Sequence, residues 1–318
     1  MALLHGLVIK EQSGFFWTEA DDGIVYRCRL RGKLLEQAQS SDIAAIGDRV
    51  TIQTLDNHQG AAAGTIIAVE PRTSVLSRSA RTEGNRGAGK AEREQVIIAN
   101  ADQAFFVFAA AAPMPHPHQI DRFLVVGEKS NIETITIVVN KTDLSNPIDI
   151  NAAFRPYETM GYRVIYTSAL QNIGVDMLKA QLKDKISVFA GPSGVGKTSL
   201  LNAIQPGLGR TVKAVSESTK LGMHTTRYSE LIKLEMGGYL ADTPGLRFLT
   251  IWDVEPEELD AYFRDIAPLV PECRFGDCTH HDEPGCAVRE AAESGRISRK
   301  RYESYVNLRD ELEAAYAF

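Results

Sequence analysis

Short runs of alternating hydrophobic and polar residues fill the N-terminal part of the chain. The runs cover residues 7–9, 15–17, 23–30, 48–52 and 64–69, and turn residues separate them. Runs of this kind, rich in β-branched and aromatic side chains, are typical of strands. Five of them at this spacing suit a small closed barrel, of which the OB-fold is a common kind. We therefore predict an OB-fold β-barrel over residues 1–75.

A different pattern begins near residue 96, where wholly apolar runs alternate with stretches of helical periodicity. The apolar runs cover 104–108, 135–139, 163–166 and 186–190, and the helical stretches cover 117–130, 148–160 and 173–184. Such alternation is typical of a parallel α/β sheet. A predicted hairpin, 229–235 with 239–241, turns at Gly237 and Gly238. The sequence thus predicts an α/β domain over residues 96–250.

The segments that flank this domain differ from it. Residues 76–95 are basic, rich in glycine and not periodic, which predicts a linker or loop. Helical patterns return after Pro244, near 256–266, 287–294 and 299–316. Residues 251–318 are therefore a predicted helical domain.

Composition limits the class of protein. Of the 318 residues, 44% are hydrophobic and 24% are charged, as in an ordinary globular protein of two or three domains. Lys10 and Glu11 interrupt the weakly apolar N-terminus, so we expect no signal peptide. The longest apolar run, 104–112, is too short to span a bilayer. We expect a cytoplasmic monomer with no membrane partner.

Net charge argues against nucleic acid as a partner, but local charge does not. The chain carries a net charge of −6. Local patches govern binding more than the average does. Basic residues gather at Arg72, Arg78, Arg81, Arg86 and Lys90, and again at Arg296, Arg299, Lys300 and Arg301. Each cluster is either a solvated surface or a contact for RNA.

A glycine-rich segment stands between the apolar run 186–190 and a helical pattern, as a phosphate-binding loop must. It reads Gly191, Pro192, Ser193, Gly194, Val195, Gly196, Lys197, Thr198, followed by Ser199. Its backbone N–H groups would wrap the phosphates, and the helix adds its positive N-terminal end. Lys197 would bridge the β- and γ-phosphates, and Thr198 would ligate Mg²⁺. A chance glycine-rich turn is the alternative.

A polar tetrad, Asn140-Lys141-Thr142-Asp143, follows the apolar run 135–139. Asp143 can accept hydrogen bonds from guanine N1–H and the 2-amino group, which adenine does not offer. Asn140 can contact the purine and tie this loop to the phosphate loop, and the Lys141 stem can cover the base. Ser168 and Ala169, at the end of the next run, would supply an N–H for guanine O6.

The remaining switch elements follow the phosphate loop. Asp242 would hold Mg²⁺ and the N–H of Gly245 would sense the γ-phosphate. Thr226, or alternatively Thr225, would complete the Mg²⁺ shell. In ordinary GTPases the phosphate loop precedes the tetrad, whereas here it follows, so the GTPase domain is circularly permuted. Chain ends that lie close together make such a permutation possible.

Three of the four cysteines lie between positions 273 and 286. Without a secretory signal, clustered cysteines indicate a metal more than disulfides. The four predicted ligands are Cys273, Cys278, His280 and Cys286, a closed set suited to one structural zinc. His281 is the alternative imidazole, and free buried cysteines are the alternative to a metal site.

The chain closely resembles the RsgA (YjeQ/YloQ) family of circularly permuted GTPases that assist small ribosomal subunit assembly. The resemblance rests on the motif order, the cysteine spacing, the segment Gly47-Asp48-Arg49-Val50 and the segment His224-Thr225-Thr226. It covers nearly the whole chain. It implies a ribosome-stimulated GTPase that binds the 30S subunit and its 16S rRNA late in maturation, and that couples hydrolysis to release of itself or other factors.

The catalytic residue is less well specified than the nucleotide ligands. The position after Gly245, where many GTPases have Gln, is Leu246, which cannot orient water. We therefore expect slow intrinsic hydrolysis. The family pattern suggests that His224 positions the water, although a loop His is commonly just solvated.

Two other functions fit parts of the sequence. A nucleotide-dependent kinase could use the same phosphate loop, but the tetrad and the lack of an evident acceptor pocket count against it. An RNA-binding module with a degenerate nucleotide site is the other, and intact Lys197, Thr198 and Asp242 disfavour it.

Overall fold

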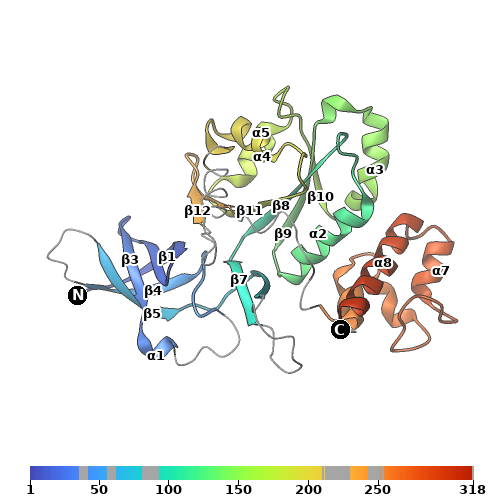
Figure 1. Cartoon of the computed structure of the whole chain (residues 1–318). Helices are drawn as coiled ribbons and strands as arrows, with labels where there is room; N and C mark the ends of the chain where they lie inside the picture. Colours follow the sequence, from blue (N-terminus) through green and yellow to red (C-terminus); the bar gives the residue numbers. More distant parts are fainter. Residues whose placement is uncertain are drawn as a thin grey trace.

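The computed structural model describes residues 1–35, 42–55, 62–80, 93–209, 211, 230–242, 251 and 254–316. Figure 1 shows a central α/β domain with the N-terminal barrel on one side and the C-terminal helical domain on the other. None of the described helices is long and apolar enough to cross a membrane.

The N-terminal barrel has the five strands that the alternating runs predict. They are β1 (Leu3–Gln12), β2 (Phe15–Ala20), β3 (Val25–Leu30), β4 (Arg49–Leu55) and β5 (Ala63–Val69), with the short helix α1 (Gly32–Leu35) after β3. The order β1-β2-β3-β5-β4 closes through a pairing of β4 with β1. Inward-facing residues such as Val8, Phe16 and Ile52 form its core. The predicted OB-like barrel is confirmed.

The prediction that residues 76–95 form a loop is wrong at both ends of that segment. Strands β6 (Val75–Ala80) and β7 (Arg93–Ala99) pair antiparallel as a separate two-stranded sheet. Leu76 and Ile98 are buried and pack into the core of the α/β domain. Polar residues in the same strands, Arg78 among them, make the segment resemble a loop in the sequence. The middle of the predicted linker, 81–92, lies outside the described residues.

The α/β domain matches its predicted elements closely. In chain order they are β8 (Gln103–Ala109), α2 (Pro117–Lys129), β9 (Thr134–Asn140), the 3-10 turn η1 (Thr142–Leu144), α3 (Pro147–Thr159), β10 (Arg163–Tyr166), α4 (Val175–Leu182), β11 (Ile186–Ala190), α5 (Lys197–Ile204), β12 (Glu230–Lys233) and β13 (Tyr239–Asp242). The sheet order is β10-β9-β8-β11-β13-β12, and only β12 runs antiparallel to its neighbour there. Helices α2 and α3 pack on one face, and α4 and α5 on the other.

The barrel attaches to the free edge of this sheet. Strand β1 pairs with β12 at Lys10 and Glu230, so the sheet runs on into the barrel. Beside this bridge, Glu19 of β2 accepts hydrogen bonds from the Lys233 ammonium and, at 2.9 Å, from the Tyr239 hydroxyl. The barrel therefore contacts both strands of the hairpin β12–β13.

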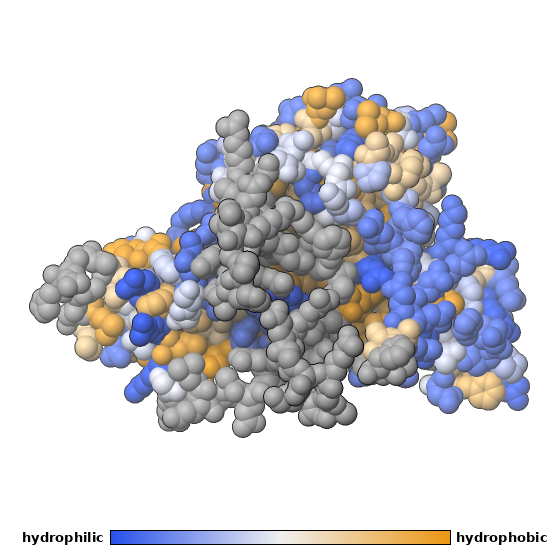
Figure 2. All heavy atoms as spheres, viewed as in Figure 1, coloured by the Kyte–Doolittle hydropathy of each residue, from blue (hydrophilic) through white to orange (hydrophobic). Residues whose placement is uncertain are grey.

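In its described residues, 251 and 254–316, the C-terminal domain has two 3-10 segments and two α-helices. They are η3 (Pro256–Tyr262), η4 (Ala267–Glu272), α7 (Ala287–Glu293) and α8 (Arg299–Tyr316). The helix predicted at 256–266 is a 3-10 segment, the tighter form that short connecting pieces often take. The visible face of this domain is mainly hydrophilic (Figure 2).

Helix α2 belongs to two cores at once. Its Phe123 packs under the sheet, whereas its Val125 packs in the core of the C-terminal domain. Beside Val125, Arg301 of α8 bridges Asp121 of α2 and, at 3.1 Å, Asp265. Asp121 is fully buried and Arg301 is 3% exposed. The C-terminal domain is thus docked on α2, and Arg301 is not available as the RNA contact that its basic cluster allowed.

Candidate functional site

Three loops that carry the predicted nucleotide ligands meet at one edge of the sheet. The tetrad follows β9, the Ser168-Ala169 segment follows β10, and the phosphate loop follows β11. These strands are parallel, so their carboxyl ends lie side by side. Ligand sites of open α/β sheets form at this edge.

Asn140 ties these three loops together. Its Nδ2 donates to the carbonyl of Val195 in the phosphate loop at 2.9 Å. Its Oδ1 accepts from the N–H of Ala169 at 3.1 Å and from the Thr167 hydroxyl at 3.2 Å. Because the side chain is only 1% exposed, these bonds are shielded from water. The predicted tie between the tetrad and the phosphate loop is present.

Asp143 is oriented by Ser168, which lies at the end of the next strand. The Ser168 hydroxyl donates to Asp143 Oδ1 at 2.5 Å and accepts from the N–H of Gln171 at 3.1 Å. Lys141 adopts a left-handed backbone conformation, with φ of 62°, and its ammonium donates to the carbonyl of Ala112. The carboxylate that would read guanine is therefore held in place by its neighbour.

The phosphate loop lies tightly against its surroundings. A Cβ on Gly191 would lie 2.1 Å from the carbonyl oxygen of Val107, and one on Gly196 would lie 2.5 Å from Asn140 Nδ2. Only glycine permits these approaches. The Lys197 ammonium donates to the carbonyls of Gly191 and Pro192 at 2.6 and 2.5 Å, which folds it over the loop.

Part of the loop is exposed, although Pro192 and Val195 are buried. The exposed residues are Ser193, Gly194, Thr198 and Ser199. Thr198 and Ser199 stand in the first turn of α5, where a helix presents unpaired N–H groups and a positive end. The arrangement can accept a polyphosphate, and the exposed Thr198 hydroxyl is open to a cation.

The predicted switch residues lie outside the described part of the chain. These residues are His224, Thr225, Thr226, Gly245 and Leu246. Asp242 ends β13, where its backbone pairs with Glu230. The predictions that concern Mg²⁺ and catalysis therefore remain predictions.

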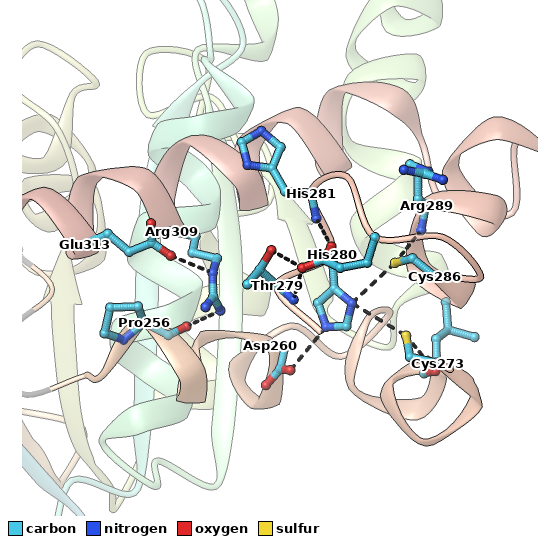
Figure 3. A network of polar contacts seen from close by, with 12 residues as sticks. Pro256, Asp260, Cys273, Thr279, His280, His281, Cys286, Arg289, Arg309 and Glu313 are labelled. Carbon is cyan, nitrogen blue, oxygen red and sulfur yellow. Dashed lines mark hydrogen bonds and ion pairs between the residues drawn. The ribbon is translucent and has the colours of Figure 1, made fainter. Parts of the chain in front are cut away.

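The four predicted zinc ligands lie together in the C-terminal domain. The ligand atoms of Cys273, Cys278, His280 and Cys286 all lie within 4.8 Å of one another, and Figure 3 shows the His280 ring directed at Cys273 and Cys286. His280 Nδ1 lies 3.6 Å from Cys273 Sγ and 3.5 Å from Cys286 Sγ. His281, the alternative imidazole, is not one of the group.

These distances fit a tetrahedral metal ion. Zinc–sulfur and zinc–nitrogen bonds of ordinary length, at a tetrahedral angle, separate sulfur and nitrogen by about 3.6 Å. Burial raises the pKa of the Cys278 thiol to about 12 and also raises the pKa of Cys286. Without a cation these two thiols therefore keep their protons at neutral pH, and a metal ion would stabilise the thiolate form in their place. Sulfur and imidazole donors suit zinc.

One neighbour of this cluster has no signal in the sequence. Asp260 of η3 places Oδ2 at 3.3 Å from His280 Nε2 (Figure 3). It precedes His280 by 20 positions and belongs to another element. No spacing pattern marks it.

Comparisons with known proteins agree with this architecture. The family model described as RsgA GTPase matches residues 69–252, and the one described as RsgA N-terminal domain matches residues 5–62. A protein of Gemmatimonas aurantiaca named small ribosomal subunit biogenesis GTPase RsgA is 42% identical over 96% of this chain and 97% of its own. A protein of the same name from Moorella thermoacetica is 40% identical over 97% of each chain.

Two solved structures have the same fold over nearly their whole length. YjeQ from Thermotoga maritima has a TM-score of 0.76 at 36% identity, with 98% of this chain and 99% of that chain covered. YloQ, described as a circularly permuted GTPase, has a TM-score of 0.73 at 31% identity, with 99% and 96% covered. The order of the motifs, the geometry of the nucleotide loops and these matches lead to one conclusion: the chain is a GTPase and belongs to the RsgA family of circularly permuted GTPases.

Proposed function

We propose that this protein acts in the late assembly of the small ribosomal subunit, to which it binds through 16S rRNA. GTP hydrolysis is coupled to release of the protein itself or of other assembly factors. The observation that carries this proposal is the match of 96–97% of the chain to relatives named small ribosomal subunit biogenesis GTPase. The protein works as a cytoplasmic monomer.

The nucleotide site holds GTP with one Mg²⁺. Asp143 reads the base, and Lys197 neutralises charge on the β- and γ-phosphates. Thr198, Thr226 and Asp242 surround the metal. His224 positions the attacking water, because Leu246 cannot. Intrinsic turnover is slow, and the ribosomal subunit stimulates it.

One structural zinc is held by Cys273, Cys278, His280 and Cys286. The supporting observations are the mutual distances of the four ligand atoms and their sulfur–nitrogen chemistry. A closed four-ligand set leaves no position for a substrate, so the metal stabilises the C-terminal domain.

Two domains flank the GTPase domain as binding arms. The division is a barrel at 1–75, a basic connector at 76–95 whose two ends lie in strands β6 and β7, the GTPase domain at 96–250 and the zinc domain at 251–318. The outer face of the barrel supports an RNA contact, because Arg27 and Arg29 stack on Phe15 with guanidinium carbons 4.8 and 4.4 Å from the ring centroid. Aromatic rings beside cations bind single-stranded nucleic acid by stacking and charge.

The test is hydrolysis of GTP and of ATP, each with and without purified small ribosomal subunits. We expect stimulation by the subunit for GTP alone. A Lys197→Ala protein is the matched control and should hydrolyse neither nucleotide. Equal use of ATP would contradict the role of Asp143, and GTP hydrolysis that ignores the subunit would contradict the ribosomal role.

His224 has its own test in the same assay. His224→Ala should bind GTP normally but lose the stimulated turnover by about 100-fold, the usual contribution of a group that handles a proton or water in the transition state. Unchanged stimulated turnover would rule His224 out as the residue that positions water.

A further inference from the structure

The two ring nitrogens of His280 have different neighbours. Nδ1 faces the sulfur atoms of Cys273 and Cys286 at 3.6 and 3.5 Å, and Nε2 faces Oδ2 of Asp260 at 3.3 Å. A nitrogen that ligates a metal carries no proton. With Nδ1 directed at the thiolates, the proton of the neutral ring is on Nε2, where it points at a carboxylate.

We propose that Asp260 is a positioning residue of the metal site. The Nε2–H of His280 donates to its carboxylate, which fixes the tautomer and the orientation of the ring and makes Nδ1 a stronger ligand. This proposal rests on the proposed zinc site and adds to it a residue from outside the cysteine–histidine segment.

Burial makes the carboxylate necessary. His280 is fully buried, so its Nε2–H does not reach bulk water and needs an acceptor within the domain. The His280 ring also packs against Tyr305, with the two centroids 5.8 Å apart. Without Asp260, the ring would keep a buried donor with no partner, or would turn and withdraw Nδ1 from the metal.

The position of Asp260 is set by the core of the domain rather than by the metal-binding segment. Its neighbour Leu259 is fully buried. At the start of the same element, the carbonyl of Pro256 accepts a hydrogen bond from Arg309 of α8 at 2.7 Å (Figure 3). Both contacts hold η3 in place, so the carboxylate meets the ring in one geometry.

A second explanation of the same contact needs no metal. A protonated His280 could form an ion pair with Asp260 and direct Nδ1–H at a thiolate. That pair would stabilise the domain, but Asp260 would then have no influence on how tightly a metal binds. Metal affinity therefore separates the two explanations.

The experiment uses the full-length protein and measures zinc affinity by competition with a chromogenic chelator. Asp260→Ala should weaken zinc binding about 10- to 100-fold, the usual effect of removing such a partner. Asp260→Asn should weaken it less, because its amide oxygen still accepts from Nε2–H. Glu258→Gln is the matched control, since Glu258 is an exposed carboxylate on the same element, and should bind zinc as the wild type does.

Cobalt substitution provides a spectroscopic measurement that a change in fold stability alone would not affect. In Asp260→Ala the visible absorption of bound Co²⁺ should shift, because the imidazole ligand is displaced. If that variant does not fold, Asp260→Asn keeps the side-chain shape and carries the test. Wild-type zinc affinity in both variants overturns the proposal for Asp260 alone. A wild-type protein that binds no zinc overturns it together with the zinc assignment.

Discussion

At the scale of single residues, the nucleotide loops hold one another in place through buried polar contacts. Asn140 joins three loops, and Ser168 orients the carboxylate of Asp143. The tetrad is one continuous stretch of sequence, and so is the phosphate loop, so the nucleotide-binding role of each could be predicted. The bond from Ser168 to Asp143 spans 25 positions, and only the parallel pairing of β9 and β10 brings these residues together.

Asp143→Asn should change the nucleotide preference from GTP to XTP. The amide presents a donor where the carboxylate accepts, which matches the reversed pattern of xanthine. We expect GTP affinity to fall by at least about 100-fold, because a site left with unpaired polar groups discriminates strongly. Titration with fluorescent GDP and XDP measures the change.

Asp149→Asn is the matched control, because it makes the same substitution at an exposed aspartate of α3. GDP affinity in Asp143→Asn that equals the wild-type value would show that another residue reads the base.

Glu11 of β1 should make stability depend on pH. Burial, reinforced by the charge of Asp42, raises the pKa of Glu11 to about 7 from its usual 4.5. The folded protein therefore holds this proton more tightly than the unfolded chain does. The resulting stabilisation is complete below pH 4.5 and is lost as the pH rises through 7.

Glu11→Gln removes this dependence. The difference in unfolding free energy between the variant and the wild type should increase in favour of the variant, on the order of 1–3 kcal/mol, from acidic to mildly alkaline pH. Urea denaturation across that range measures the difference, and the exposed Glu133→Gln serves as control. A constant difference at all pH values would mean that Glu11 does not titrate there.

At the scale of secondary-structure elements, the predicted ranges are most accurate where the local pattern of hydrophobic residues determines which side chains are buried. Helix α3 and strand β9 begin and end within one residue of their predicted ranges, 148–160 and 135–139. Strands β6 and β7 were missed, because each finds its partner across a long intervening segment. The second buried face of α2 was missed for the same reason, since Asp121 and Arg301 are 180 positions apart.

The ion pairs of Arg301 with Asp121 of α2 and with Asp265 give the clearest prediction for stability. Arg301→Ala leaves the fully buried Asp121 without its cation and should cost about 3–5 kcal/mol of unfolding free energy. Arg299→Ala is the matched control on the same helix. It removes an exposed pair with Glu303 and should cost less than about 0.5 kcal/mol.

Urea denaturation of both variants measures these costs. The double variant Asp121→Asn/Arg301→Met should recover part of the loss, because no charge then stays buried alone. Equal stability of Arg301→Ala and Arg299→Ala would show that the ion pairs of Arg301 contribute nothing to the free energy of unfolding.

At the scale of the whole molecule, the two outer domains are attached at different places on the GTPase domain (Figure 1). The barrel meets the hairpin β12–β13, which borders the segments that contain the predicted switch residues. The C-terminal domain docks on α2. A change in the hairpin would therefore reach the barrel directly.

Glu19→Ala should loosen the attachment of the barrel. Burial raises the pKa of Glu19, but hydrogen bonds from Lys233 and Tyr239 outweigh it and lower that pKa below the usual value. Loss of these bonds should speed amide exchange in β12 several-fold, because local opening then costs less. Hydrogen exchange with mass spectrometry measures the rate.

Asp22→Ala is the control, because it removes a hydrogen bond to Tyr26 within the barrel only. Equal exchange in β12 for the two variants would show that Glu19 does not hold the barrel to the sheet.

The sharing of α2 between two cores has a consequence for synthesis of the chain. Arg301 is translated 180 residues after Asp121, on the order of tens of seconds later at ordinary elongation rates. During that interval the GTPase sheet can form, but one side of α2 keeps an unpaired carboxylate. Folding of the nascent chain is therefore completed only when helix α8 has emerged, and a truncated product lacking α8 leaves a charged defect on which quality-control proteases can act.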